Sequence, residues 1–134
     1  MKETESRAKT LIAIIDDDES FRIALTGPMQ SLEFPVEAFA SAEAFLTSPK
    51  DRDPSCLITD VHMPRMTGIE LHRILVKSGR SVPTILITAY PVEDDRVRAL
   101  SEGVVCYLSK PLDDSALLDC VRRALKRDKS ESSI

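Results

Sequence analysis

The stretch CLITDVHMP, Cys56 to Pro64, runs directly from an apolar segment into a carboxylate. The first part, Cys56 to Thr59, is short and continuous, as expected for a strand that is covered on both faces of a sheet. Asp60 ends this apolar run, and Pro64 closes the loop that follows. An aspartate at the end of a core strand raises the question of what the fold uses it for.

Four further apolar runs accompany this stretch along the chain. Three of them are continuous and read as buried strands: TLIAII at Thr10 to Ile15, PTILIT at Pro83 to Thr88, and VVCYL at Val104 to Leu108. The fourth, PVEAF at Pro35 to Phe39, is shorter and carries a charge in its middle, which is typical of an edge strand. The chain is therefore predicted to contain five strands.

Segments with helical periodicity separate these runs. Apolar residues recur at helical spacing over Phe21–Leu32, Ile69–Leu75 and Leu117–Leu125. Ser41 can cap a short helix through Leu46, and Val92–Glu102 has a thin apolar stripe. The β-α order, repeated five times with right-handed crossovers, predicts an α/β three-layer sandwich around a parallel sheet.

Some local signals mark the ends of the predicted helices. Asp113 and Asp114 stand at the start of the last helix, and Gly103 is placed to end the helix before the fifth strand. Gly27-Pro28 falls inside the first helix, where proline removes the amide that would bond the carbonyl of Ala24. We expect a kink there, or a helix in two pieces.

Length and charge limit the classes of protein to consider. A chain of 134 residues with 43% hydrophobic content is the size of one globular domain. Its 18 basic and 22 acidic residues give a net charge of −4, so direct binding to nucleic acid or to an anionic membrane surface is not expected. No apolar stretch is long enough to cross a bilayer, and the charged segment Met1 to Lys9 does not resemble a signal peptide. We expect a cytoplasmic protein.

The cysteines and histidines are predicted to be structural. Cys56, Cys106 and Cys120 are widely spaced without a CxxC motif, so neither a disulfide framework nor a zinc site is expected, and we interpret them as small buried hydrophobes. His62 has no second histidine or cysteine at zinc-site spacing. His72 is expected on the solvent side of its helix.

Polar residues follow the predicted strands where they end. In open α/β sheets the functional crevice lies beyond the carboxyl ends of the strands. Asp16–Glu19 follows the first strand, Asp60 the third, Thr88 ends the fourth, and Lys110 stands at the end of the fifth. These residues are far apart in the sequence, yet the topology predicts that they meet at one rim.

The chemistry of this set favours phosphoryl transfer. Clustered carboxylates repel one another unless a cation lies among them, and hard oxygen ligands favour Mg²⁺ or a similar divalent ion. Lys110 adds a fixed positive charge, and the Thr88 hydroxyl can hydrogen-bond an oxyanion. Asp60, with such neighbours, is the natural nucleophile for attack on phosphorus. Asp18 and Glu19 are interpreted as helix N-caps instead.

Four motifs carry a resemblance to a known family: IIDDDE (Ile14 to Glu19), LITDVHMPRMTG (Leu57 to Gly68), ILITA (Ile85 to Ala89) and YLSKP (Tyr107 to Pro111). In this order they are similar to the signatures of the receiver domain of two-component response regulators.

The extent of the match sets the expected domain boundaries. It covers residues 10–127, which implies a receiver domain there, a flexible N-terminal segment at 1–9 and a polar, frayed tail at 128–134. The resemblance also implies a five-stranded sheet in the flavodoxin-like order 2-1-3-4-5, with five helices.

The resemblance implies a metal-dependent acceptor site. Asp60 would accept a phosphoryl group from a histidine kinase or a histidine phosphotransfer protein, in a reaction that needs Mg²⁺ or Mn²⁺. Asp17, helped by Asp16, would bind the metal together with Asp60 and the backbone carbonyl of His62. The long acidic run leaves Asp18 as an alternative to Asp17, which we prefer because it lies four residues before Phe21.

The remaining implied roles concern the phosphoryl group and the switch. Lys110 would pair with the phosphoryl oxygens, and its peptide bond to Pro111 would be cis. Thr88 and Tyr107 would be the switch pair, with the Thr88 hydroxyl moving toward the phosphoryl group while the ring turns inward. Ala89 is small and would leave the phosphoryl pocket open.

The resulting functional hypothesis is a signalling switch rather than an enzyme. The resemblance also implies a homodimer through the fourth helix and the fifth strand. One alternative is a phosphohydrolase of the haloacid dehalogenase type. Such enzymes need a second acidic residue two positions after the nucleophile, where this chain has His62. A nucleotide-binding module is disfavoured because no glycine-rich loop follows the first strand. A further hypothesis is that the chain is the regulatory fragment of a larger transcription factor.

Overall fold

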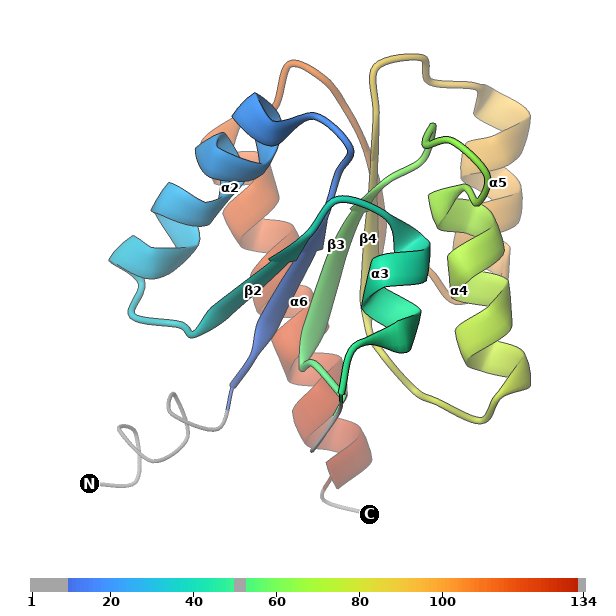
Figure 1. Cartoon of the computed structure of the whole chain (residues 1–134). Coiled ribbons are helices and arrows are strands. Elements are labelled where there is room, and N and C mark those ends of the chain that lie inside the picture. Colours follow the sequence, from blue (N-terminus) through green and yellow to red (C-terminus); the bar gives the residue numbers. More distant parts are fainter. Residues whose placement is uncertain (1–9, 50–52, 133–134) are drawn as a thin grey trace.

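A parallel five-stranded sheet forms the centre of the protein. The computed structural model describes residues 10–49 and 53–132 (Figure 1), so the predicted N-terminal segment lies outside the described residues. The strands are β1 (Ile12–Ile15), β2 (Val36–Phe39), β3 (Cys56–Asp60), β4 (Thr84–Thr88) and β5 (Cys106–Ser109). They pair in the order β2-β1-β3-β4-β5, all parallel. The predicted topology is confirmed, including the edge position of β2.

Helices cover both faces of this sheet. The described residues form α2 (Glu19–Ser31), α3 (Ala42–Thr47), α4 (Gly68–Lys77), α5 (Glu93–Ser101) and α6 (Asp114–Ser132). Helices α2 and α6 lie on one face and α3, α4 and α5 on the other, which gives the predicted three layers (Figure 1). None of the helices in this part of the chain is long and apolar enough to span a membrane.

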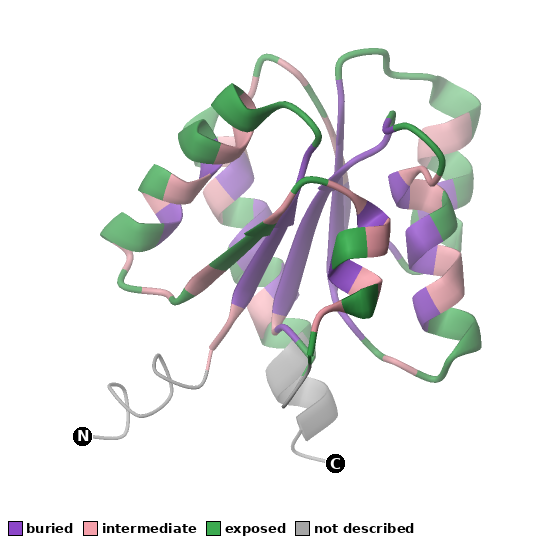
Figure 2. Cartoon of the chain, viewed as in Figure 1, coloured by how far each residue is buried: buried purple, intermediate pink, exposed green. Residues whose placement is uncertain are grey.

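The strands are buried because side chains pack on both of their faces. In β1, Ile12 and Ile14 contact the core beneath α2 and α6, whereas Ala13 and Ile15 contact the core beneath α3 and α4. Figure 2 shows the central strands as a buried layer between partly exposed helices. The alternation of strand side chains explains why the apolar runs are continuous rather than amphipathic.

Several predicted helix ends are confirmed. The Ser41 hydroxyl accepts the amide of Ala44 at the start of α3, and the Asp113 carboxylate accepts the amide of Ala116 at the start of α6. Gly103 has a φ of 104° just after α5, a conformation that favours glycine. These contacts satisfy backbone groups that a helix end leaves without partners.

Helix α2 is continuous through Pro28, so the prediction of a helix in two pieces is wrong. Pro28 lies in the last turn, where its missing amide costs one backbone bond to the carbonyl of Ala24. The next residue, Met29, is fully buried and holds this turn against the sheet. A kink at Pro28 stays a prediction.

Helix α6 continues to Ser132, past the expected end of the domain at Arg127. The segment 128–132 is therefore helical in this structure, and the domain boundaries stay predictions. The helix extends the chain beyond the sheet on the side where the strands begin (Figure 1).

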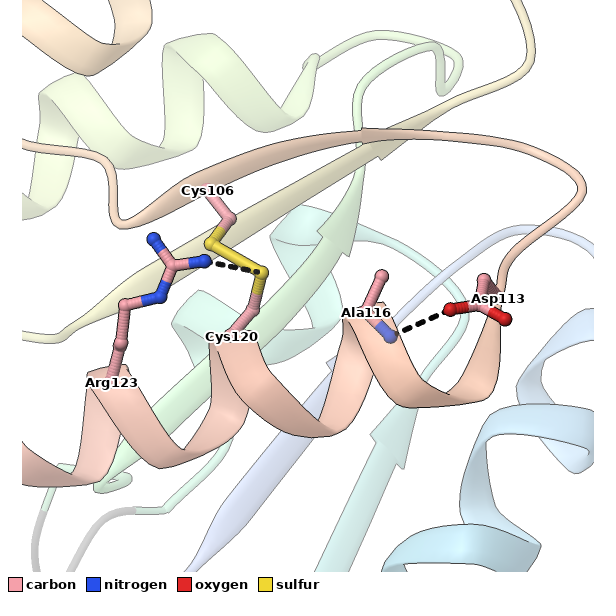
Figure 3. The surroundings of a disulfide bond; sticks show 5 residues. All are labelled: Cys106, Asp113, Ala116, Cys120 and Arg123. Atoms are coloured by element: carbon pink, nitrogen blue, oxygen red, sulfur yellow. Dashed lines mark hydrogen bonds between the residues drawn. A yellow bond between two sulfur atoms is a disulfide. The ribbon is translucent and has the colours of Figure 1, made fainter.

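The prediction that no disulfide forms is wrong. Cys106 in β5 and Cys120 in α6 are joined by a disulfide bond (Figure 3), while Cys56 is buried and keeps its thiol. Packing of α6 on the sheet brings the two Cα atoms to 6.2 Å, within the range that a disulfide requires. Sequence spacing could not show this contact because it depends on tertiary packing. All three cysteines are nevertheless buried, as expected.

The prediction for His72 is also wrong, since its side chain is only 6% exposed. His72 directly follows the fully buried Leu71 and lies three residues before Leu75, so it stands on the flank of the buried face of α4. Residues near the start of β4 and the end of α5 line a pocket together with His72 at this edge of the helix.

Candidate functional site

The carboxyl ends of the central strands place the predicted site residues at one rim. Asp60 is the last residue of β3, and Thr88 is the last residue of β4. Asp16 follows β1, which pairs with β3, and Lys110 follows β5, which pairs with β4. The parallel register therefore brings together side chains from four separate parts of the sequence.

Three carboxylates form a group at this rim. Asp16, Asp17 and Asp60 each offer an oxygen, and these oxygens lie within 4.8 Å of one another. Asp16 and Asp60 are buried, whereas Asp17 is exposed. Asp18 is outside the group: its carboxylate caps α2 by accepting the amides of Ser20 at 2.9 Å and Phe21 at 3.4 Å. The N-cap interpretation of Asp18 is thereby confirmed.

Lys110 supplies the positive charge beside these carboxylates. Its Nζ lies 3.2 Å from Asp16 Oδ2 and 3.7 Å from Asp60 Oδ1. The same ammonium lies 4.0 Å from the ring centroid of Phe21, in a cation–π contact. The side chain of Lys110 is 20% exposed, so its charge is partly shielded from water.

The environment of Asp60 raises its pKa to about 6. Burial is the largest cause, followed by the negative charge of Asp16. Lys110 opposes this shift, and Asp17 adds a smaller contribution in the raising direction. Burial and the neighbouring carboxylates therefore favour the protonated form of Asp60 more than in an exposed aspartate.

The two predicted switch residues lie on neighbouring strands but make separate contacts. The buried Thr88 side-chain oxygen accepts the amide of Tyr90 at 3.0 Å. The Tyr107 hydroxyl accepts the amide of Val92 at 3.2 Å, and Val92 is the N-cap residue of α5. In this conformation the half-buried Tyr107 ring is therefore tied to the start of α5.

The other predicted residues surround the rim. The Lys110–Pro111 peptide bond is cis, as expected. Ala89 is exposed directly after Thr88. His62 is exposed, and its ring meets that of Tyr90 edge to face with 5.8 Å between centroids.

Two residues of the site, Phe21 and Gly68, were not predicted from the sequence to have a role there. Phe21 was predicted only as a core position, although its ring contacts Lys110. Gly68 begins α4 and donates its amide to the carbonyl of Val61 at 3.0 Å. A side chain there would overlap the carbonyl oxygen of Asp60. The only sequence signal for Gly68 was its place at the end of LITDVHMPRMTG.

The residues at the rim fit a divalent cation. The group has three carboxylates and one ammonium, so negative charge is in excess, and all the donor atoms are hard oxygens of the kind that Mg²⁺ and Mn²⁺ prefer. Burial is the largest cause of the raised pKa of Asp60, and the neighbouring negative charges of Asp16 and Asp17 add to it. Asp16, Asp17 and Asp60 are thus the residues that would hold a metal.

Known proteins share this sequence pattern. The pattern of the response regulator receiver domain matches residues 12–122. The chain is 36% identical to nodulation protein W of Bradyrhizobium diazoefficiens over 126 residues, which cover 94% of this chain and 56% of that protein. It is 34% identical to the transcriptional regulatory protein FixJ of Rhizobium meliloti over 113 residues, 84% of this chain and 55% of that one. The chain spans about half the length of these curated relatives.

A solved structure shares the fold as well. The crystal structure of FixJ-N superposes with a TM-score of 0.78 at 34% identity, covering 88% of this chain and 94% of that chain. By its sequence match and its fold, the chain belongs to the response regulator receiver domain family of two-component systems.

Proposed function

We propose that Asp60 accepts a phosphoryl group from a phosphohistidine of a histidine kinase or histidine phosphotransfer protein, in a reaction that depends on Mg²⁺ or Mn²⁺. The observation that carries this proposal is the position of Lys110, whose ammonium lies between the carboxylates of Asp16 and Asp60. A nucleophilic carboxylate beside fixed positive charge is equipped for transfer of a phosphoryl group.

The chemical step uses the residues at the rim. An Asp60 carboxylate oxygen attacks phosphorus, and the bond between phosphorus and the donor imidazole breaks. The electron pair of that bond stays on the imidazole nitrogen, which then takes a proton. Lys110 offsets negative charge on the transferred phosphoryl oxygens, and the Thr88 hydroxyl proton is available to one of them, because the oxygen of that hydroxyl already accepts the amide of Tyr90.

A metal fits this scheme as a source of positive charge. Asp17, Asp60 and the backbone carbonyl of His62 would hold it, with Asp16 assisting. When bound, Mg²⁺ or Mn²⁺ would neutralise charge on the phosphoryl oxygens. Asp17 is suited to this role because it is exposed, and its neighbour Asp18 is already engaged as a helix cap.

Regulation would follow from a two-state equilibrium. Movement of Thr88 toward the phosphoryl group would make room for the Tyr107 ring to turn inward, which would break its bond to Val92. The start of α5 and the adjoining surface of β5 would change, and with them the affinity for partners. A second copy of the chain is one such partner, which would bind through α5 and β5. The exposed apolar side chains Val92, Val97 and Leu100 support this homodimer.

The protein would act as a cytoplasmic switch that is phosphorylated and dephosphorylated, rather than as an enzyme with a separate substrate. A second possibility is that the chain is the regulatory part of a longer transcriptional regulator. It is supported by the share of the relatives that the chain covers, about half of nodulation protein W and of FixJ.

Intact mass spectrometry after incubation with acetyl phosphate tests the proposal. We expect one added phosphoryl group with Mg²⁺, none with EDTA and none in Asp60→Asn. Asp18→Asn is the matched control, because it makes the same change of charge two residues from Asp16 and should still be phosphorylated. Uptake that persists in Asp60→Asn would contradict the proposal, and steady hydrolysis of a phosphate ester without accumulation would favour the hydrolase.

A further inference from the structure

A pocket of about 300 Å³ lies at the end of the sheet away from Asp60. Its walls come from the second half of α4, the turn before β4, the turn between α5 and β5, and α6. Because the strands are parallel, these segments lie at the beginning of β4 and β5, whereas Asp60 lies at a strand end. The pocket is therefore separate from the phosphorylation site.

His72 is the buried polar group of this pocket. It lines the cavity and is 6% exposed, and the nearby charges of Glu102 and Arg73 act on its imidazole. Burial lowers the pKa of the imidazole, which favours its neutral form with one donor and one acceptor nitrogen. The ring nitrogens of His72 are not fully enclosed by protein, so they can hydrogen-bond a molecule that is bound in the cavity.

Arg127 supplies the net charge of the pocket wall. Its guanidinium donates to the carbonyl of Gly103 at 2.8 Å and pairs with no carboxylate in the described part of the chain. The other charged residues of the wall are already neutralised: Arg80 bonds the Asp53 carboxylate at 2.7 Å and 2.9 Å, and Glu102 is held by two bonds from Arg73. Within the described part of the chain, the charge of the wall that is left without a counterion is therefore positive.

We propose that this pocket binds a small anion bearing a carboxylate or phosphate group, with Arg127 pairing the anion and His72 hydrogen-bonding a polar atom of the ligand. A guanidinium suits both kinds of anion because its N–H groups match their oxygens. The volume is at the small end of the range for ligand pockets, which favours a small metabolite. Such a ligand would link α6 to the turn between α5 and β5. The inference is independent of the proposed phosphorylation at Asp60.

Histidine NMR of the full chain gives a direct test, because the chain has only two histidines. His72 reports on the pocket, and the exposed His62 reports on the rim near Tyr90. The unphosphorylated protein is titrated with succinate or inorganic phosphate at constant ionic strength without divalent metal. We expect the ring signals of His72 to shift saturably with at least one of the two anions, while those of His62 stay unchanged. Succinamide, the neutral analogue of succinate, should give no saturable shift.

Two variants on the same helix test the role of Arg127. Arg127→Gln should weaken anion binding by roughly tenfold or more, the size expected for loss of a charge-assisted pair. Arg122→Gln removes the same charge from an exposed position outside the pocket and should leave binding unchanged. Absence of a saturable His72 shift with both anions, an equal response to succinamide, or equal weakening by both variants would overturn the proposal. Phosphorylation of Asp60 in Arg127→Gln, measured separately by intact mass, shows whether the first site is intact.

Discussion

Lys110 connects the main interactions of the rim at the scale of single residues. Its ammonium contacts the Asp16 and Asp60 carboxylates and the face of the Phe21 ring. Fixing a long side chain costs conformational entropy, and here three contacts together offset that cost for Lys110. Lys110 is thereby held where a phosphoryl group on Asp60 would need positive charge.

Asp60 should make the stability of the metal-free protein depend on pH. Its pKa is raised from 3.8 to about 6, so the folded state binds a proton more tightly than the unfolded state between these values. The proton's contribution to stability is fully present below about pH 4 and is lost as the pH rises through about 6. Asp60→Asn stays neutral, so its stability relative to wild type should increase over this window by about 1–2 kcal/mol, after allowance for solvent at the rim.

Urea unfolding in EDTA at a series of pH values measures this difference. The difference in unfolding free energy between Asp60→Asn and wild type should change between the pKa values of Asp60 in the unfolded and folded states. A difference between Asp60→Asn and wild type that stays constant from pH 4 to pH 7 would contradict the assigned environment of Asp60.

Asp17 and Asp18 should differ sharply in their effect on metal binding. A ligand that binds only the folded state stabilises it, by about 2.7 kcal/mol when its concentration is a hundred times Kd. Asp17→Asn should remove most of the stabilisation by Mg²⁺. Asp18→Asn should keep it, because asparagine caps a helix about as well as aspartate and Asp18 is outside the carboxylate group.

Thermal unfolding with and without saturating Mg²⁺ distinguishes the two variants. Equal losses in both would show that the cation responds to the general acidity of the loop rather than to Asp17. If only Asp18→Asn loses the stabilisation by Mg²⁺, then Asp18 binds the metal and Asp17 does not.

At the scale of elements, features that follow a regular sequence pattern could be predicted, whereas features that depend on tertiary contacts could not. The strands were predicted because buried parallel strands require continuous apolar runs, and the cap at Ser41 because its hydroxyl bonds within the helix that it starts. The disulfide and the burial of His72 escaped prediction because both depend on which elements pack together.

The cross-link between β5 and α6 should contribute to stability in proportion to the loop it closes. Cys106 and Cys120 are 14 residues apart, and closing a loop of this size is worth about 3 kcal/mol in the chain-entropy view. Reductant should therefore lower the unfolding free energy of wild type, measured in urea, by about this amount. Cys120→Ala should be insensitive to reductant, whereas Cys56→Ala should stay sensitive because it keeps the bond.

Alkylation of the unreduced, denatured chain provides an independent count of free thiols. One modified cysteine, Cys56, is expected before reduction. Modification of Cys106 and Cys120 without reductant would contradict the disulfide. An unchanged unfolding free energy of wild type on reduction would contradict its stabilising role.

At the scale of the whole molecule, the topology of the sheet explains why the site could be predicted. A parallel sheet places every strand end at the same edge, so residues after separate strands were expected to meet, and Asp16, Asp60 and Lys110 do. The contact between Phe21 and Lys110 and the pocket at His72 were not predictable. They depend on side-chain positions across different elements, for which the sequence has no periodic signal.

The two ends of the sheet have different chemistry. The end with Asp60 has excess negative charge, and at the opposite end Arg127 on α6 has no carboxylate partner among the described side chains. Helix α6 leaves the domain at this second end (Figure 1).

The central claim, that Asp60 is the phosphoryl acceptor, is tested most directly by chemical mapping of the modified residue. The protein is phosphorylated with Mg²⁺, the acyl phosphate is reduced with borohydride, and the resulting homoserine is located by peptide mass spectrometry. We predict homoserine at position 60 and at no other aspartate of the rim. Homoserine at position 16 or 17, or none at all from a protein that has gained a phosphoryl group, would contradict the claim.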